Sequence, residues 1–188
     1  MPLFFPQDLQ QNTLGVSQPL WCQPQRSQYK IPHSYYSWLV DKGSLTQKLI
    51  DKSQGRLSIE VLQQRIRRAN FSEQRALLMP HRHWGVIREV VLYGDGIPWI
   101  YARTVIPLTT LHGPLRRLYY LGNKSLGEQL FTDPTMSRGP MEVAQLQPRQ
   151  LPEKLQISQV TWGRRSVFRV SNKPLLVSEI FLPALLNH

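Results

Sequence analysis

The chain has 188 residues, of which 41% are hydrophobic, and a formal net charge of +11. This length suits one globular domain with its own hydrophobic core, and the composition is that of a globular protein, neither disordered nor membrane-like. No apolar run approaches the ~20 residues of a membrane-spanning helix, and the apolar start, Met1–Pro6, lacks the features of a signal peptide. The single cysteine, Cys22, cannot form an internal disulfide, so we expect a cytoplasmic protein in which this thiol has no catalytic role.

The excess of positive charge predicts an anionic partner, because a field of this size concentrates anions of any kind. Nucleic acid and a small polyanionic metabolite both fit, and the charge alone does not separate them. The basic residues are scattered along the chain apart from short groups such as Arg65, Arg67 and Arg68.

The chain begins with residues 1–30, which are rich in Gln, Pro and Ser and show no sustained periodicity. This composition predicts a flexible arm, followed by one domain over residues 31–188. Apolar residues at helical spacing predict a helix over Ser34–Gly43. Ser44, with a glutamine three residues later, has the form of a capping box, so a second helix should begin at Leu45.

The rest of the chain alternates between strands and short helices. In chain order we expect a strand from Arg56, a loop over 72–80, hairpin strands over 84–93 and 99–106, a helix over 115–121, a helix capped by Ser125, and strands over 141–146, 155–162, 164–170 and 175–182. Tight turns join neighbouring strands, which makes the sheet antiparallel. Helices grouped between runs of strands predict the α+β class.

Strand alternation places three charged residues, Arg88, Arg103 and Glu179, on faces that are otherwise apolar. A four- or five-residue loop in the first hairpin would set Arg88 and Arg103 level, where they would repel unless an anion lay beside them. An ion pair of Glu179 with one of these arginines is an alternative, and a solvent-facing sheet is another. The first N–H groups of the two capped helices, at Leu45 and Leu126, have no helical partners and suit anions. Together these features predict a closed, anion-lined pocket.

Motifs for several other chemistries are missing from the sequence. It contains no HExxH, no pair of CxxC motifs, no phosphate loop and no GxSxG elbow. His81 and His83 lie close together, but no carboxylate or cysteine pattern completes a metal site around them. We therefore expect no metal, and either an enzyme without a cofactor or a protein that is not an enzyme.

Several motifs, taken in order and spacing, resemble those of chorismate pyruvate-lyases, and the resemblance covers roughly residues 35–184. The motifs are Ile87-Arg88-Glu89-Val90, Gly94-Asp95-Gly96-Ile97-Pro98-Trp99, Ala102-Arg103-Thr104-Val105-Ile106-Pro107, Leu126-Gly127 with Leu130-Phe131-Thr132, Trp162-Gly163-Arg164-Arg165-Ser166, Lys173-Pro174-Leu175-Leu176 and Glu179-Ile180-Phe181-Leu182-Pro183.

The resemblance implies an antiparallel sheet with helical flaps that cover a buried ligand pocket. It also implies an enzyme that eliminates pyruvate from chorismate to leave 4-hydroxybenzoate, the first step toward a quinone head group. In this family an arginine, here Arg88, and two backbone N–H groups, here those of Leu45 and Leu126, hold the ring carboxylate. Glu179 would bind the ring hydroxyl, and Arg103 would serve the pyruvyl end. The family implies no cofactor, and we expect a monomer without nucleic acid or stable membrane insertion.

Two other functions are consistent with the sequence. The effector-binding domains of some GntR-type transcription regulators share this fold and bind small molecules without chemistry. The residues before the domain are too short here for a helix-turn-helix, which favours the enzyme. A nucleic-acid-binding protein would rest on charge alone and would bind with a steep dependence on salt.

Overall fold

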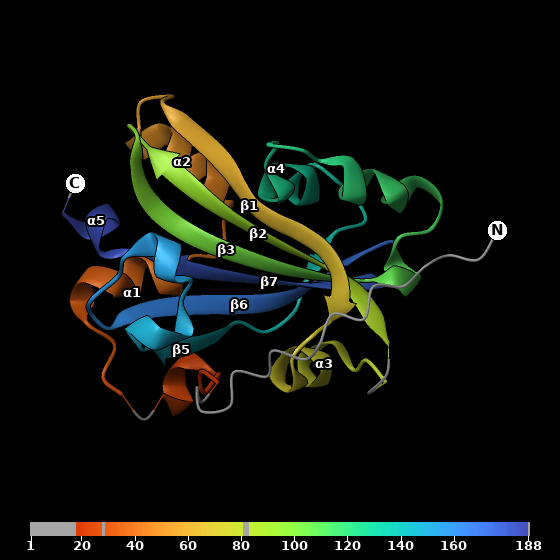
Figure 1. Ribbon diagram of the computed structural model, residues 1–188, viewed down its shortest axis with the longest axis horizontal. Helices are drawn as coiled ribbons and strands as arrows, with labels where there is room; N and C mark the ends of the chain where they lie inside the picture. Colours follow the sequence, from red (N-terminus) through yellow and green to blue (C-terminus); the bar gives the residue numbers. More distant parts are fainter. Residues whose placement is uncertain (1–17, 28, 81–82, 188) are drawn as a thin grey trace.

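The computed structural model describes residues 18–27, 29–80 and 83–187, and it has the expected α+β architecture (Figure 1). Its centre is a seven-stranded antiparallel sheet in the order β1-β2-β3-β7-β6-β4, with β5 also paired to β6. The strands are β1 (Leu57–Arg68), β2 (Trp84–Gly94), β3 (Ile97–Pro107), β4 (Ser137–Arg138), β5 (Glu142–Leu146), β6 (Thr161–Val170) and β7 (Lys173–Phe181).

Short helices lie on both faces of the sheet. They are α1 (His33–Leu39), α2 (Leu45–Lys52), α3 (Phe71–Leu77), α4 (Leu126–Phe131) and α5 (Pro183–Leu186), together with 3-10 turns, of which η3 (Gly113–Tyr120) is the longest. We call the face that carries Arg88 the inner face; α2 and α4 cover it. The opposite, outer face is covered by α3, which Figure 1 shows across the sheet from α4. Apolar clusters fill the space on both faces.

A one-residue bulge in the first hairpin decides which charged residues face each other. The turn Asp95-Gly96 has positive φ at both positions, +57° and +79°, the backbone of a two-residue hairpin turn that matches strand twist. Tyr93 lies opposite Pro98, but Leu92 lies opposite Ile100, which leaves Trp99 as the extra residue of a β-bulge.

Because of this bulge, the two hairpin arginines are not aligned as the sequence predicts. Without it Arg88 would lie opposite Arg103, as predicted. With it Arg88 lies opposite Thr104, and Arg103 lies opposite Glu89. Because successive side chains point to opposite faces, Arg88 is on the inner face and Arg103 on the outer one. The prediction that the two arginines share a face is therefore wrong.

Other elements differ from the sequence-based expectation in detail. The expected loop over 72–80 contains α3, whose N-cap Asn70 forms a reciprocal capping box with Glu73. The expected strand over 155–162 is mostly irregular, and only its end from Thr161 joins the sheet as β6. Leu155 still packs against an apolar cluster, so burial there does not come with strand pairing. The helix over 115–121 is a 3-10 helix, η3.

Part of the expected N-terminal arm packs against the domain. Residues 1–17 lie outside the described residues. Within 18–27, Cys22 forms an antiparallel bridge with Val143 through two backbone hydrogen bonds of 3.1 and 2.7 Å. The Trp21 ring lies 4.9 Å from the guanidinium of Arg165. These contacts attach the segment to the sheet, so the expectation of a loose arm does not hold for residues 18–27.

Candidate functional site

A cavity lies between the inner face of the sheet and the N-termini of α2 and α4. Most of its lining is apolar and comes from β2, β3, β7 and the two helices. The polar residues of its lining are Thr46, Arg88, Thr104, Lys124, Ser125 and Glu179. A few polar groups on an apolar wall are typical of a small-molecule site.

The two helix N-termini meet at this cavity. Ser44 and Ser125 are the N-caps, and each side-chain oxygen accepts a hydrogen bond from the backbone N–H three residues further on. The hydroxyls of Thr46 and Ser125 are 2.7 Å apart and hydrogen-bonded. A Cβ on Gly127 would come within 2.8 Å of Thr46 Oγ1, so the approach of the helices requires glycine there.

Two unpaired backbone donors follow from this arrangement. Leu45 and Leu126 are the first residues of α2 and α4 and both line the cavity. In the part of the chain that the structure describes, neither N–H donates a hydrogen bond. The positive ends of two helices therefore meet at one wall, which favours a bound anion.

Arg88 brings a full positive charge to the same cavity. Arg88 is only 3% exposed, and it makes no ion pair with any carboxylate of the described residues. The guanidinium donates one long hydrogen bond, 3.3 Å from Nη2 to the backbone oxygen of Lys124. Burial lowers the pKa of Arg88 from its usual value, because desolvation opposes the charged form. A buried cation without a counter-charge is costly unless a ligand supplies one.

Glu179 lies on the same face and lines the cavity. Its Oε2 accepts a hydrogen bond of 2.6 Å from Nε of Arg164, which lies directly opposite on β6. Arg164 is fixed in turn, because its Nη1 donates to the backbone oxygens of Trp38 and Asp41 over 2.8 and 2.6 Å. The second oxygen of Glu179, Oε1, accepts no hydrogen bond from the described residues and is available to a ligand.

The sequence analysis missed Arg164, although the sequence carries a signal for it. Arg164 alternates with Trp162 and Phe168 on one strand face, the same pattern of a charge among apolar residues that singled out Glu179. The turn Ser171-Asn172 sets the pairing of the two strands. The expected alternative of an ion pair to Glu179 was therefore right in kind, but the partner is neither Arg88 nor Arg103.

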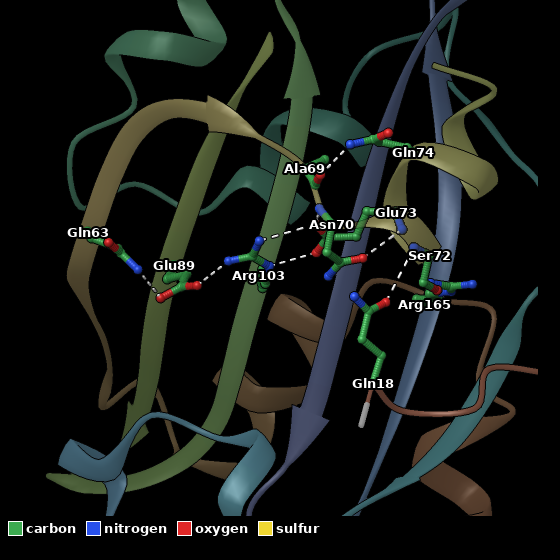
Figure 2. A network of polar contacts seen from close by, with 10 residues as sticks. All are labelled: Gln18, Gln63, Ala69, Asn70, Ser72, Glu73, Gln74, Glu89, Arg103 and Arg165. Atoms are coloured by element: carbon green, nitrogen blue, oxygen red, sulfur yellow. Dashed lines mark hydrogen bonds and ion pairs between the residues drawn. The ribbon is translucent and has the colours of Figure 1, made fainter. Parts of the chain in front are cut away.

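Arg103 belongs to a polar network on the outer face, away from the cavity (Figure 2). Its Nε donates to Oε1 of Glu73 over 2.6 Å, and its Nη1 donates to Glu89. Burial alone would lower the pKa of Arg103, but the bonds and charges of these two carboxylates outweigh it and raise the pKa above its usual value. This network joins α3 to the sheet, so we assign Arg103 to structure and remove it from the candidate site.

Other candidate features do not extend the site. Among the described residues, no group of three or more His, Cys, Asp and Glu side chains is placed to hold a metal ion, and no helix there is long and apolar enough to cross a membrane. Desolvation and the nearby charge of Glu142 raise the pKa of the Cys22 thiol, which disfavours the reactive thiolate.

The fold and the cavity together define an α+β domain with a mostly apolar, arginine-bearing cavity between a sheet and two helix N-termini. The family model described as "Chorismate lyase" matches residues 16–188. The chain therefore belongs to the chorismate lyase family.

Individual relatives agree with this assignment. A protein of Marinobacter nauticus is 41% identical over 148 residues, which are 79% of this chain and 76% of the relative. One of Pseudomonas aeruginosa is 36% identical over 169 residues, or 90% of this chain and 94% of the relative. Both carry the name "Probable chorismate pyruvate-lyase".

A solved structure shows the same fold at low identity. The effector domain of PhnF from Mycobacterium smegmatis matches with a TM-score of 0.56 and 15% identity, over 77% of this chain and 91% of that one. The likeness concerns the fold alone, since fold does not determine function.

Proposed function

We propose that this protein eliminates pyruvate from chorismate and leaves 4-hydroxybenzoate, a precursor of quinone head groups. The observation that carries the proposal is the buried guanidinium of Arg88, which has no carboxylate partner among the described residues and shares its cavity with two unpaired helix N–H groups. Such a site is suited to a carboxylate, which accepts several charge-assisted hydrogen bonds at once. The names of the relatives indicate which carboxylate to test.

The ring of the substrate would lie between Arg88 and Glu179. In our proposal Arg88, with the N–H groups of Leu45 and Leu126, binds the ring carboxylate. Oε1 of Glu179 accepts a hydrogen bond from the ring hydroxyl on the other side of the ring. The apolar walls, among them Val90 and Ile100, exclude water and accept the faces of the ring.

The reaction itself needs orientation more than added reagents. The bond between ring carbon and ether oxygen breaks, the neighbouring ring carbon loses its hydrogen, and the enolpyruvyl methylene gains a proton, so that the products are an aromatic ring and pyruvate. A site that holds the side chain over the ring hydrogen lowers the barrier through orientation, by about 7–11 kcal/mol in well-aligned cases. Donors at the departing oxygen stabilise the charge that develops there.

The direct test is incubation of the purified protein with chorismate and detection of both products. We expect 4-hydroxybenzoate and pyruvate in equal amounts. Arg88→Ala and Glu179→Ala should each remove most of the activity, whereas Arg56→Ala, at an exposed ion pair with Asp95, is the matched control and should not. Full activity in both site variants would refute the assignment of the site.

A sensor of aromatic acids is the second candidate, because the fold resembles the effector domain of PhnF. Such a protein would bind 4-hydroxybenzoate in the same cavity and would release no pyruvate from chorismate. The product assay therefore separates the two candidates.

A further inference from the structure

A second arginine without a carboxylate partner lies beside the cavity. Arg138, at the end of β4, pairs with Phe168 of β6, and its guanidinium lies 5.2 Å from the centre of the Phe168 ring. Phe168 lines the cavity. Nε of Arg138 donates to Oγ of Ser166 over 3.1 Å, so its side chain lies on the inner face together with Arg88 and Glu179.

The hydrogen bonds of Arg138 leave much of its capacity unused. Its Nη1 donates only to the backbone oxygens of Asp41 and Lys42, at 3.5 and 3.4 Å. These distances are at the limit of a hydrogen bond. A guanidinium carries five N–H donors, so a carboxylate could replace both contacts with shorter, charge-assisted bonds.

The charge of Arg138 is also only partly compensated. In the described residues it makes no ion pair. Glu179 and Asp41 are the carboxylates near it, but Arg164 holds the first and Lys48 the second. Burial and the nearby positive charge of Arg164 lower the pKa of Arg138, and the two carboxylates offset this only in part.

The sheet register places Arg138 at the far end of the site from Arg88. Arg88, Thr104, Val177 and Ser166 are partners in turn across four neighbouring strands. Three strand spacings separate the first from the last, about 14 Å between their backbones. Ser166 accepts the hydrogen bond of Arg138, so the buried Arg88 and the half-buried Arg138 approach the inner face from opposite sides.

Glu179 is on β7, between the strands of these two cations, and is displaced from their row by two residues along the strand. Its partner on β3 is Ala102, the second residue before Thr104. A ligand that reaches from Arg88 to Arg138 therefore passes Glu179. A dicarboxylate with a hydroxyl between its two charged ends would satisfy all three side chains at once.

We propose that Arg138 forms a second anion subsite, which binds the carboxylate of the enolpyruvyl group and then of the departing pyruvate. This inference rests on the proposed function. In chorismate the ether oxygen and the hydroxyl are on two adjacent ring carbons. Because Glu179 binds the hydroxyl, the enolpyruvyl group extends on the Glu179 side of the ring. Arg164 already holds Glu179 and two backbone oxygens, which leaves Arg138 as the arginine on this side of the site without a carboxylate partner among the described residues. Arg138 thus takes the role that the sequence had suggested for Arg103.

The test compares two ligands that differ in the pyruvyl group. Arg138→Gln removes the charge and keeps hydrogen-bonding capacity. We expect the KM for chorismate to rise on the order of 10- to 100-fold, the value of one charged hydrogen-bonded contact. The dissociation constant of 4-hydroxybenzoate, which has no pyruvyl group, should stay within about twofold because its contacts with Arg88 and Glu179 are intact. Arg138→Lys keeps the charge and should recover part of the loss, and Arg56→Gln is the control for net charge.

A second measurement does not depend on the folding of the glutamine variant. Pyruvate should bind the wild-type complex with 4-hydroxybenzoate, detected by saturation-transfer NMR, and should bind the Arg138→Lys complex more weakly. Equal losses of affinity for chorismate and for 4-hydroxybenzoate would show that Arg138 is a purely structural residue, and this would overturn the subsite. Unchanged kinetics in both Arg138 variants would overturn it as well. If the wild-type protein releases no pyruvate from chorismate, the proposed function itself fails, and this result is distinct from either of the others.

Discussion

Arg164 and Glu179 lie directly opposite each other on β6 and β7, with Nε and Oε2 2.6 Å apart. Arg164 is 1% exposed, while the Glu179 side chain is 17% exposed toward the cavity. The same guanidinium binds the backbone at the end of α1. One buried cation therefore fixes both a candidate catalytic carboxylate and the segment that leads to α2.

This pair gives a prediction about stability and activity. Glu179→Ala leaves the buried Arg164 uncompensated and should lower the free energy of unfolding by about 3–5 kcal/mol. The double variant Arg164→Met/Glu179→Leu should lose less, because apolar groups replace the pair. Urea unfolding of Arg164→Met, of Glu179→Leu and of the double variant measures the coupling, and additive losses would contradict it. Arg164→Met alone should lower kcat/KM on the order of 100-fold, since Glu179 is no longer held in place.

Replacement of Arg88 should have opposite effects on stability and binding. Burial lowers the pKa of Arg88, so its charged form opposes folding at every pH below that pKa, including neutral pH. Arg88→Met should therefore raise the free energy of unfolding by about 1–2 kcal/mol, while binding of 4-hydroxybenzoate is lost. Chemical denaturation and calorimetric titration test the two halves. A destabilised Arg88→Met protein would show that the guanidinium serves the fold.

The carboxylate of the ligand should be essential for binding. In wild-type protein, 4-hydroxybenzoate at 100 times its dissociation constant should add about 2.7 kcal/mol to the free energy of unfolding. The amide analogue 4-hydroxybenzamide has the same shape without the charge and should add much less. Thermal denaturation with each compound makes the comparison, and equal stabilisation by both would argue against an anion site.

The close approach of α2 and α4 predicts a rescue experiment. In Gly127→Ala the added methyl group would come within 2.8 Å of Thr46 Oγ1, so the helix N-termini must separate, at a cost of about 1–3 kcal/mol. Affinity for 4-hydroxybenzoate should fall with it. Removing the hydroxyl in the double variant Gly127→Ala/Thr46→Ala should restore part of the affinity. No rescue would mean that the contact with Thr46 is not the cause of the loss.

Arg103 should affect stability without affecting the substrate. Arg103→Met removes the cation between the buried carboxylates of Glu73 and Glu89. The free energy of unfolding should fall by about 3 kcal/mol, the lower end of the loss expected when a buried ion pair is broken, because the Arg103 side chain is a quarter exposed. Below the melting transition, KM for chorismate should match that of the wild type. A raised KM at full folding would return Arg103 to the site.

The sequence was informative where local chemistry sets the structure. The N-cap serines Ser44 and Ser125 marked two helix starts correctly, because an N-cap depends on residues within one turn. Alternation along the strands placed Arg88 and Glu179 each on an otherwise apolar face of its own strand, since that pattern depends only on the pleat.

What the sequence missed depends on contacts between distant segments or on a single bulged residue. The bulge at Trp99 shifts one strand by a residue, and such a shift exchanges the two faces for every residue beyond it. It accounts for the error at Arg103. Arg138 belongs to a two-residue strand, too short for any periodic signal, and its place beside the site follows only from the pairing of β4 with β6.

The hydroxyl contact between Thr46 and Ser125 also affects the kinetics of release. The two residues are 79 positions apart in the chain, and theirs is the one hydrogen bond that connects the two helix starts in the described part of the protein. A carboxylate bound by both starts is enclosed until they move apart. We therefore expect the residence time of a product to be set by the rate at which this contact opens, a property of the protein that stays the same for ligands of very different affinity.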